Sequence, residues 1–191
     1  AEVISYGGQL NMMQSDDKTE KNIDIELLYL DLSVCGPCQG TEATFDEAIS
    51  EVRPVLQDTG FYITVTKTLV ENETQAQNLG FVSSPTIRIN GHDIQPEVRE
   101  DLCNSCSSLC GDDVNCRVWV YEGKEYWAPP KAMIIEAIMS EAYGGTKQNV
   151  KTPTPSIELP DNLKRFFAAK EELGSEDGSN CCPPSSDCCS H

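Results

Sequence analysis

The sequence predicts an α/β domain with a mixed central sheet flanked by helices. An apolar, strand-like segment over 23–32 is followed by an amphipathic helix and then by a second strand-like segment over 61–70. Two strands that are joined through a helix pair in parallel. Turn residues farther along the chain add an antiparallel hairpin, so we expect strands of both directions in the sheet.

The first strand and helix follow from apolar periodicity. Residues 23–32 form a β-compatible run that is typical of a central strand covered on both faces. After Cys38, apolar residues recur at the spacing of one helix face. They are Phe45, Ala48, Ile49, Val52, Val55 and Leu56. Pro54 lies inside this helix, where proline loosens or kinks the last turn. Gly60 ends the helix, and the alternation over 61–70 predicts the second strand.

The middle of the chain predicts a short helix, a strand and an insertion. A polar helix over 73–79 is closed by Gly80. The segment 86–89 is strand-like, and Asn90-Gly91 after it is a strong signal for a tight turn. Residues 95–116 break the pattern with four cysteines among polar residues, which indicates a cysteine-rich insertion.

The end of the domain predicts a hairpin and a helix. Strand-like segments over 117–121 and 125–127 flank Glu122-Gly123-Lys124. Pro130 occupies a favourable first helical position, and the apolar helix after it is stopped by Gly144-Gly145.

We therefore expect three regions. Residues 1–21 form an N-terminal extension, and residues 22–145 form the α/β domain that carries the insertion at 95–116. Residues 146–191 contain a proline-containing linker, a short helix capped by Asp161 and ended by Gly174, and a disordered, cysteine-rich tail.

Charge and hydropathy exclude several classes of partner. With 14 basic and 31 acidic residues, the formal net charge is −17, which opposes binding to nucleic acid or to an anionic membrane. No apolar run is long enough for a transmembrane helix, so we expect no membrane insertion. The favoured location is the cytoplasm, or a secreted or periplasmic one if a leader has been removed.

The ten cysteines are grouped, which indicates redox or metal chemistry. The first group, Cys35-Gly36-Pro37-Cys38, lies between the first strand and the first helix. At a helix N-terminus, unsatisfied N–H groups and the helix dipole favour a thiolate, so Cys35 is a candidate nucleophile. Cys38, one turn later, is placed to resolve a mixed disulfide. The alternatives for this pair are two structural cysteines or half of a zinc site.

The stretch from Ile23 to Tyr143 resembles the thioredoxin fold. Thioredoxins carry the same tetrapeptide, Cys35-Gly36-Pro37-Cys38, and Ser84-Pro85-Thr86 resembles the cis-proline loop of that family. The resemblance implies that Cys35 attacks, that Cys38 resolves, and that Pro85 is a cis residue shaping the substrate groove. Val34 and Gln39 replace the tryptophan and lysine that usually flank the motif, which suggests a dedicated partner.

The second group lies in the insertion and leaves several structures open. Its members are Cys103, Cys106, Cys110 and Cys116. Four thiolates could form a closed zinc site, although the short spacing between the second and third is unusual for one. The other interpretations are one or two disulfides, redox-active thiols, or no cross-link.

The third group consists of two pairs of vicinal cysteines in the tail. Its members are Cys181, Cys182, Cys188 and Cys189. Adjacent cysteines form strained disulfides, so such pairs more often bind soft ions or relay thiols. The tail resembles the C-terminal vicinal pairs of the ArsD family of arsenical metallochaperones, which share the thioredoxin fold. This resemblance implies arsenite or another soft ion as a ligand; the alternative is a disordered end with incidental cysteines.

We expect a thiol–disulfide oxidoreductase that needs no cofactor and exchanges with a protein thiol or disulfide partner, or with a donor or acceptor of metalloid. The alternatives are a soft-metal or arsenite carrier that uses the tail cysteines, and a structural module whose cysteines only stabilise it. No P-loop, dinucleotide-binding or nucleophile-elbow motif is found, and two histidines offer little for a serine triad.

Overall fold

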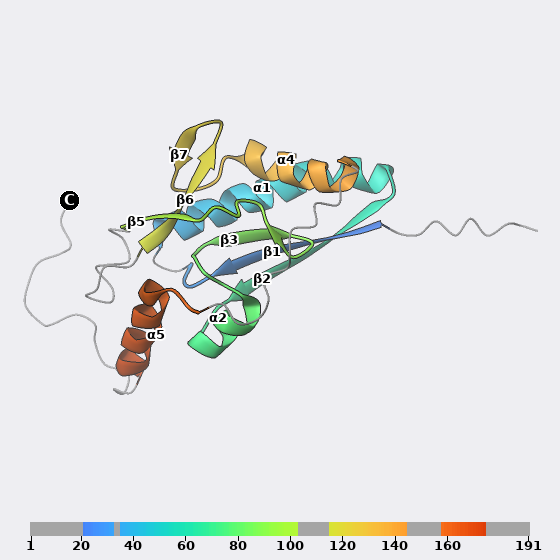
Figure 1. The fold of residues 1–191 in the computed structure, drawn as a ribbon. Helices are drawn as coiled ribbons and strands as arrows, with labels where there is room; N and C mark the ends of the chain where they lie inside the picture. The colour runs from blue at the N-terminus through green and yellow to red at the C-terminus, as the bar shows by residue number, and fades with distance from the viewer. Residues whose placement is uncertain (1–20, 33–34, 103–114, 145–157, 175–191) are drawn as a thin grey trace, which may run out of the picture.

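The computed structural model describes residues 21–32, 35–102, 115–144 and 158–174 (Figure 1). Its central sheet has four strands in the order β2-β1-β3-β4. β1 (Lys21–Tyr29) pairs in parallel with β2 (Phe61–Leu69) and antiparallel with β3 (Thr86–Ile89). β3 pairs antiparallel with the short β4 (His92–Asp93). The mixed sheet predicted from the sequence is therefore confirmed.

α1 (Gly36–Asp58) provides the crossover between the parallel strands β1 and β2. The helix runs through Pro54, and its buried residues follow the predicted face except at Val55, which was predicted on that face but is 52% exposed. The tight turn expected at Asn90-Gly91 joins β3 to β4, with positive φ angles of 50° and 79°. Asparagine and glycine tolerate this left-handed conformation better than other residues do.

A second sheet contains three antiparallel strands. β6 (Asn115–Tyr121) pairs with β5 (Arg99–Leu102) on one side and with β7 (Lys124–Tyr126) on the other. The predicted hairpin is present, but its turn is only Glu122-Gly123, and Lys124 already pairs with Tyr121. β5 and the start of β6 lie within the segment expected to be an insertion, so residues 99–102 and 115–116 of that segment belong to this sheet.

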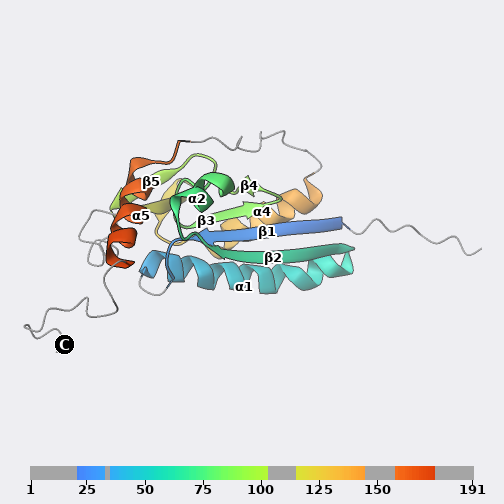
Figure 2. The ribbon, with the colours of Figure 1, turned by 90° about the horizontal axis from the view of Figure 1, so that it is seen from below.

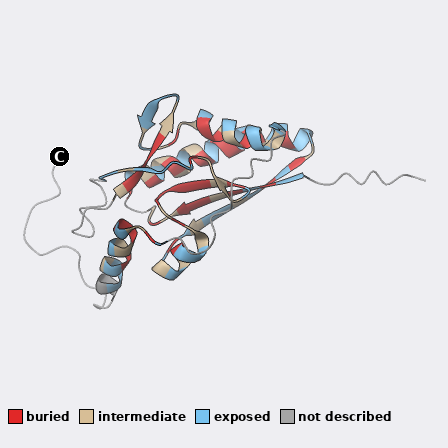
Figure 3. Ribbon diagram, viewed as in Figure 1, coloured by how far each residue is buried: buried red, intermediate tan, exposed pale blue. Residues whose placement is uncertain are grey.

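The helices cover the central sheet unevenly. α1 and α4 (Lys131–Tyr143) lie on one side, and α2 (Glu73–Leu79) and α5 (Asp161–Gly174) lie on the other (Figures 1 and 2). Ile25 and Leu27 of β1 are fully buried in the core that α1 and α4 share with the sheet. On the opposite face Asp24 is exposed, and only Leu28 near the end of β1 is buried (Figure 3). Coverage on both faces, predicted for the whole strand, is thus confined to its C-terminal end.

α5 forms part of a second apolar cluster. The cluster joins this helix and the residues before it to the ends of β1 and β2 and to α2. Its buried members are Leu28, Leu30, Val70, Ala76, Phe81, Leu159, Leu163 and Phe167. The helix predicted over 161–174 is therefore present and packs against the central sheet. Among the described residues, no helix is both long and apolar enough to cross a membrane.

Candidate functional site

Cys35 and Cys38 begin α1. Cys35 is the N-cap residue, with φ −89° and ψ 104°, and Cys38 lies in the first turn and is buried. Pro37 fits this turn because the first helical N–H groups have no intrahelical acceptor to lose. The Gln39 side chain donates a hydrogen bond to the Leu32 carbonyl over 2.9 Å, which ties the start of the helix to the chain that leaves β1.

A third cysteine joins this pair. Cys116 of β6 forms a buried cluster with Cys35 and Cys38, and each of the three residues is only 2% exposed. The Sγ atoms of Cys35 and Cys116 are 3.9 Å apart. Leu32 packs against the cluster from the loop after β1. The structure thus brings Cys116 into contact with a residue 81 positions away in the sequence.

The Ser84-Pro85 loop lies beside the same cysteines. The peptide bond between these residues is cis, as the resemblance to thioredoxins implied. Ser84 is buried, and its Oγ lies 3.7 Å from Cys38 Sγ. The same Oγ accepts a hydrogen bond from the Leu30 N–H over 3.1 Å. A hydroxyl can accept two hydrogen bonds and donate one, so either the Ser84 hydroxyl or the Cys38 thiol can be the donor in their contact.

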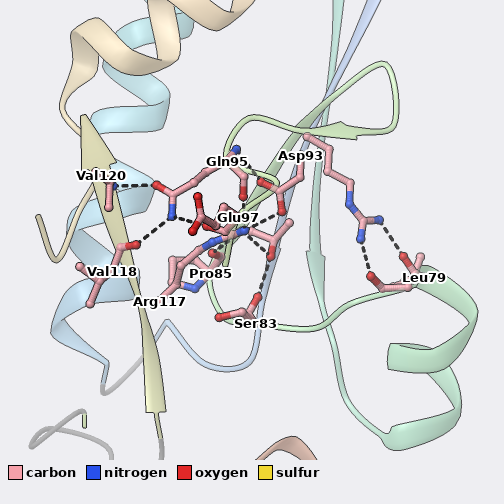
Figure 4. Close-up of polar contacts among 12 residues, drawn as sticks. Leu79, Ser83, Pro85, Asp93, Gln95, Glu97, Arg117, Val118 and Val120 are labelled. Atoms are coloured by element: carbon pink, nitrogen blue, oxygen red, sulfur yellow. Dashed lines mark hydrogen bonds and ion pairs between the residues drawn. The ribbon is translucent and has the colours of Figure 1, made fainter. Parts of the chain in front are cut away.

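Arg117 holds the proline loop against β6. Its side chain is fully buried, and Nη2 forms an ion pair of 2.7 Å with Asp93 Oδ2 (Figure 4). The remaining guanidinium hydrogen bonds go to Gln95 O at 2.9 Å, Thr86 Oγ1 at 2.9 Å and Pro85 O at 3.5 Å. The Arg117 main-chain N–H donates to Ser84 O over 2.9 Å. The loop before β3 is therefore fastened by both the backbone and the side chain of one residue.

Gln95 connects the two sheets. Its Nε2 donates to Val118 O over 3.0 Å, and its Oε1 accepts from the Val120 N–H over 2.7 Å (Figure 4). These contacts satisfy β6 main-chain groups with a side-chain amide instead of a neighbouring strand. Gln95 is 7% exposed, so the link is shielded from competing water.

A family profile described as "Domain of unknown function (DUF2703)" matches residues 23–138. The match covers more than half of the chain. This chain belongs to the DUF2703 family. No curated protein and no solved structure is significantly similar to it, and no thioredoxin or ArsD family was matched. The mixed sheet and its helices are compatible with a thioredoxin-like fold.

The DUF2703 match contains the described cysteine cluster and the proline loop but ends before α5. The structure brings together the predicted residues Cys35 and Cys38, and it places Ser84, which precedes the predicted Pro85, against Cys38. It also places Cys116 with them, although the sequence had grouped Cys116 with its neighbours in the insertion. The other predicted ligands, and Val34, lie outside the described residues. These ligands are Cys103, Cys106, Cys110, Cys181, Cys182, Cys188 and Cys189.

Sequence reasoning missed two polar residues of this DUF2703 site, Ser84 as a contact of Cys38 and Arg117 as the anchor of the loop. The available signal for Arg117 was a charged residue in a segment that otherwise reads as a buried strand. Within the described part of the chain, no group of three or more histidine, cysteine or acidic side chains is arranged to hold a metal ion.

A second arginine stands near the loop. Burial lowers the pKa of Arg88, and the nearby carboxylates of Asp93 and Glu26 oppose this effect. Arg88 donates hydrogen bonds to Leu79 O at 2.7 Å and Gly80 O at 2.8 Å. These carbonyls end α2, so the guanidinium satisfies groups that the helix itself leaves unpaired. Asp93 thus acts on two cations, the buried Arg117 and the partly buried Arg88.

Proposed function

We propose that this DUF2703 chain has a thioredoxin-like fold and catalyses thiol–disulfide exchange through Cys35 and Cys38. The supporting topology is a β1-α1-β2 crossover whose helix begins with the dithiol motif, followed by the antiparallel strand β3. One contact carries the proposal: Cys38 Sγ lies 3.7 Å from the hydroxyl of Ser84, which immediately precedes cis-Pro85. The dithiol and the proline loop, 46 residues apart at this contact, therefore form one site.

Cys35 is the attacking residue in this proposal. Its position at the N-cap of α1 places the sulfur near the positive end of the helix dipole, which favours the thiolate. The Cys35 thiolate attacks one sulfur of a substrate disulfide. A bond from Cys35 to that sulfur forms as the substrate disulfide breaks, and the other substrate sulfur leaves as a thiolate.

Cys38 completes the reaction. Its thiolate attacks the Cys35 sulfur, the Cys35–Cys38 disulfide forms, and the second substrate thiolate leaves. The substrate gains two electrons and the protein dithiol loses two. A hydrogen bond from the Ser84 hydroxyl would favour the thiolate of Cys38, because hydrogen bonds to a charged form stabilise it.

Burial restricts the substrates that this site can accept. Cys35 and Cys38 are each only 2% exposed, so the residues packed around the dithiol have to move before a substrate disulfide reaches Cys35. A small disulfide requires a smaller opening than a folded protein partner does. We therefore choose oxidised glutathione as the probe.

The test uses the reduced full chain and follows exchange with oxidised glutathione. Digestion at aspartate isolates Cys35 and Cys38 in peptide 31–45, away from the other eight cysteines. We expect the wild-type peptide to gain an internal disulfide. In the Cys35→Ser chain, we expect any glutathione adduct at Cys38 to form much more slowly than the wild-type disulfide does. A Cys35→Ser chain that consumes glutathione disulfide at residues 31–45 as fast as wild type would contradict the proposal.

A truncation after Gly174 separates this function from carriage by the tail. The shortened chain keeps the described dithiol, proline loop and α5. We expect it to form the Cys35–Cys38 disulfide at the wild-type rate. Loss of that reaction would assign the chemistry to the tail cysteines instead.

A further inference from the structure

Cys116 is the one nucleophilic side chain in the described cluster that the proposed reaction does not use. Its Sγ lies 3.9 Å from Cys35 Sγ, and the residue is 2% exposed. A sulfur–sulfur bond is about 2.05 Å long, so the two atoms are close non-bonded neighbours. Moving one thiol between staggered rotamers covers a distance of this order.

Two contacts of β6 fix the position of Cys116: the pairing with β5 and the hydrogen bond from the next residue to the proline loop. On one strand edge Cys116 is the register partner of Asp101 in β5. The next residue, Arg117, donates its main-chain N–H to Ser84 O and buries its guanidinium against Asp93 and Thr86. Successive strand residues point to opposite faces. Arg117 therefore anchors the strand on the proline loop while Cys116 faces the start of α1.

The two contacts of the Ser84 loop connect the three thiols. Ser84 Oγ lies beside Cys38, and Ser84 O accepts the hydrogen bond that positions the residue after Cys116. One buried loop thus contacts Cys38 directly and bonds to the residue next to Cys116. A cysteine that only filled space would need neither this anchoring nor a sulfur as its neighbour.

We propose that Cys116 is a second exchange partner of Cys35, competing with Cys38 for its sulfur. This inference rests on the proposed function, in which Cys35 is the redox-active thiol. In the exchange, the Cys116 thiolate attacks the Cys35 sulfur of the Cys35–Cys38 disulfide. A Cys35–Cys116 bond forms, the Cys35–Cys38 bond breaks, and Cys38 leaves as a thiolate. The step rearranges one disulfide into another, so no external oxidant or reductant is consumed.

The exchange gives the buried packing around Cys35 a chemical role, because Cys116 is part of that packing. Cys116 and Cys35 pack in the same buried cluster, and a Cys35–Cys116 bond holds the nucleophile inside that cluster. In this state the Cys35 sulfur is bonded to Cys116 and cannot attack a substrate, whereas Cys38 is present as a thiolate. Attack by Cys38 on Cys35 restores the original disulfide and releases Cys116.

The same contact also allows resolution without Cys38. When Cys35 carries a glutathionyl group, the Cys116 thiolate can attack the Cys35 sulfur, form the Cys35–Cys116 disulfide and expel glutathione as a thiolate. The oxidant in this sequence is oxidised glutathione, which is reduced to two glutathione molecules as the two protein thiols become one disulfide.

The decisive experiment removes Cys38 and identifies which sulfur then forms a disulfide with Cys35. The full-length Cys38→Ser chain is reduced, oxidised with glutathione disulfide, alkylated and digested at aspartate. Cleavage places Cys35 in peptide 31–45 and Cys116 alone in peptide 113–160. The remaining cysteines fall in peptides 101–111, 177–186 and 187–191, so each possible link has its own mass. We expect the 31–45 to 113–160 cross-link to be the main product.

Two matched double variants serve as controls. Cys38→Ser with Cys116→Ser is expected to retain the Cys35–glutathione adduct, whereas Cys38→Ser with Cys110→Ser is expected to give the cross-link as before. Circular dichroism and the fluorescence of buried Trp119 check folding, and Cys38→Ala replaces Cys38→Ser if the latter does not fold.

Three other results would overturn the inference. A stable Cys35–glutathione adduct beside an alkylated Cys116 in the Cys38→Ser chain would refute Cys116 as a partner and leave the proposed function intact. A link from Cys35 to another peptide would assign the exchange to a different thiol. Absence of any disulfide at Cys35 in wild type and variants would refute both this inference and the proposed function.

Discussion

Replacing Asp93 with asparagine removes the negative charge that faces the buried guanidinium of Arg117. Asparagine has nearly the same shape, so packing is preserved, but Arg117 keeps a full positive charge with no carboxylate beside it. The Arg117 side chain is 0% exposed and that of Asp93 is 19% exposed. Breaking a buried ion pair by removing one partner costs about 3–5 kcal/mol. Because Asp93 retains some contact with water, we expect a loss of about 3 kcal/mol in the free energy of unfolding.

The assay is urea unfolding under reducing conditions, followed by circular dichroism, with Glu125→Gln as the matched control. Glu125 pairs with Arg99 at 3.3 Å, but the two side chains are 65% and 51% exposed. An exposed pair contributes roughly 0–1 kcal/mol, so the control is expected to unfold near the wild-type midpoint. Equal, small effects of the two substitutions would refute the role assigned to the buried pair.

Three further predictions concern α5, alkaline stability and the Ser84 hydroxyl. Phe167→Ala is expected to lower the free energy of unfolding by about 3 kcal/mol in the same assay, since Phe167 is 1% exposed in the second apolar cluster; an unchanged urea midpoint would show that α5 does not stabilise the sheet. Burial lowers the pKa of Lys67, but hydrogen bonds and charge from Asp46 and Glu42 outweigh it and raise that pKa above 10.5. The stabilisation from Lys67 is therefore complete below pH 10.5 and is lost as pH rises through the higher folded-state pKa. In the Lys67→Met chain we expect the urea midpoint to fall less steeply with pH in that alkaline range than it does in the wild-type chain. Equal slopes for the two chains would contradict this. Ser84→Ala is expected to slow closure of the Cys35–Cys38 disulfide about fivefold, the equivalent of a hydrogen bond of about 1 kcal/mol; stopped-flow measurement of glutathione release checks this, and an unchanged rate would remove Ser84 from the mechanism.

Local signals predicted most of the secondary structure. The apolar periodicity located α1, the Asn90-Gly91 pair located the turn between β3 and β4, and the helix from Asp161 to Gly174 lies where its apolar face indicated. Each of these features depends on residues that are close in sequence. The thioredoxin resemblance also anticipated the cis bond at Pro85, which no composition or periodicity shows.

Long-range packing limited the prediction of the site. Cys116 meets Cys35 only because β6 is fastened to the Ser84 loop, a placement that spacing within residues 103–116 cannot indicate. The link between the two sheets runs through the side chain of Gln95, which hydrogen bonds to β6 main-chain groups and is far from β6 in the sequence. Burial along β1 was overestimated because α2 and α5 cover only the C-terminal end of that strand on their face.

An equilibrium redox titration of the full chain tests whether Cys35 and Cys38 form a reversible dithiol–disulfide pair. Protein is equilibrated in buffers of graded potential set by the ratio of reduced to oxidised glutathione, quenched with acid, alkylated and digested at aspartate, and peptide 31–45 is followed by mass. We expect a reversible two-electron transition between dithiol and internal disulfide, with a midpoint between about −270 and −120 mV, as in known dithiol oxidoreductases. A peptide that remains a dithiol at the most oxidising potentials would contradict the assignment of Cys35 and Cys38 as the exchanging pair.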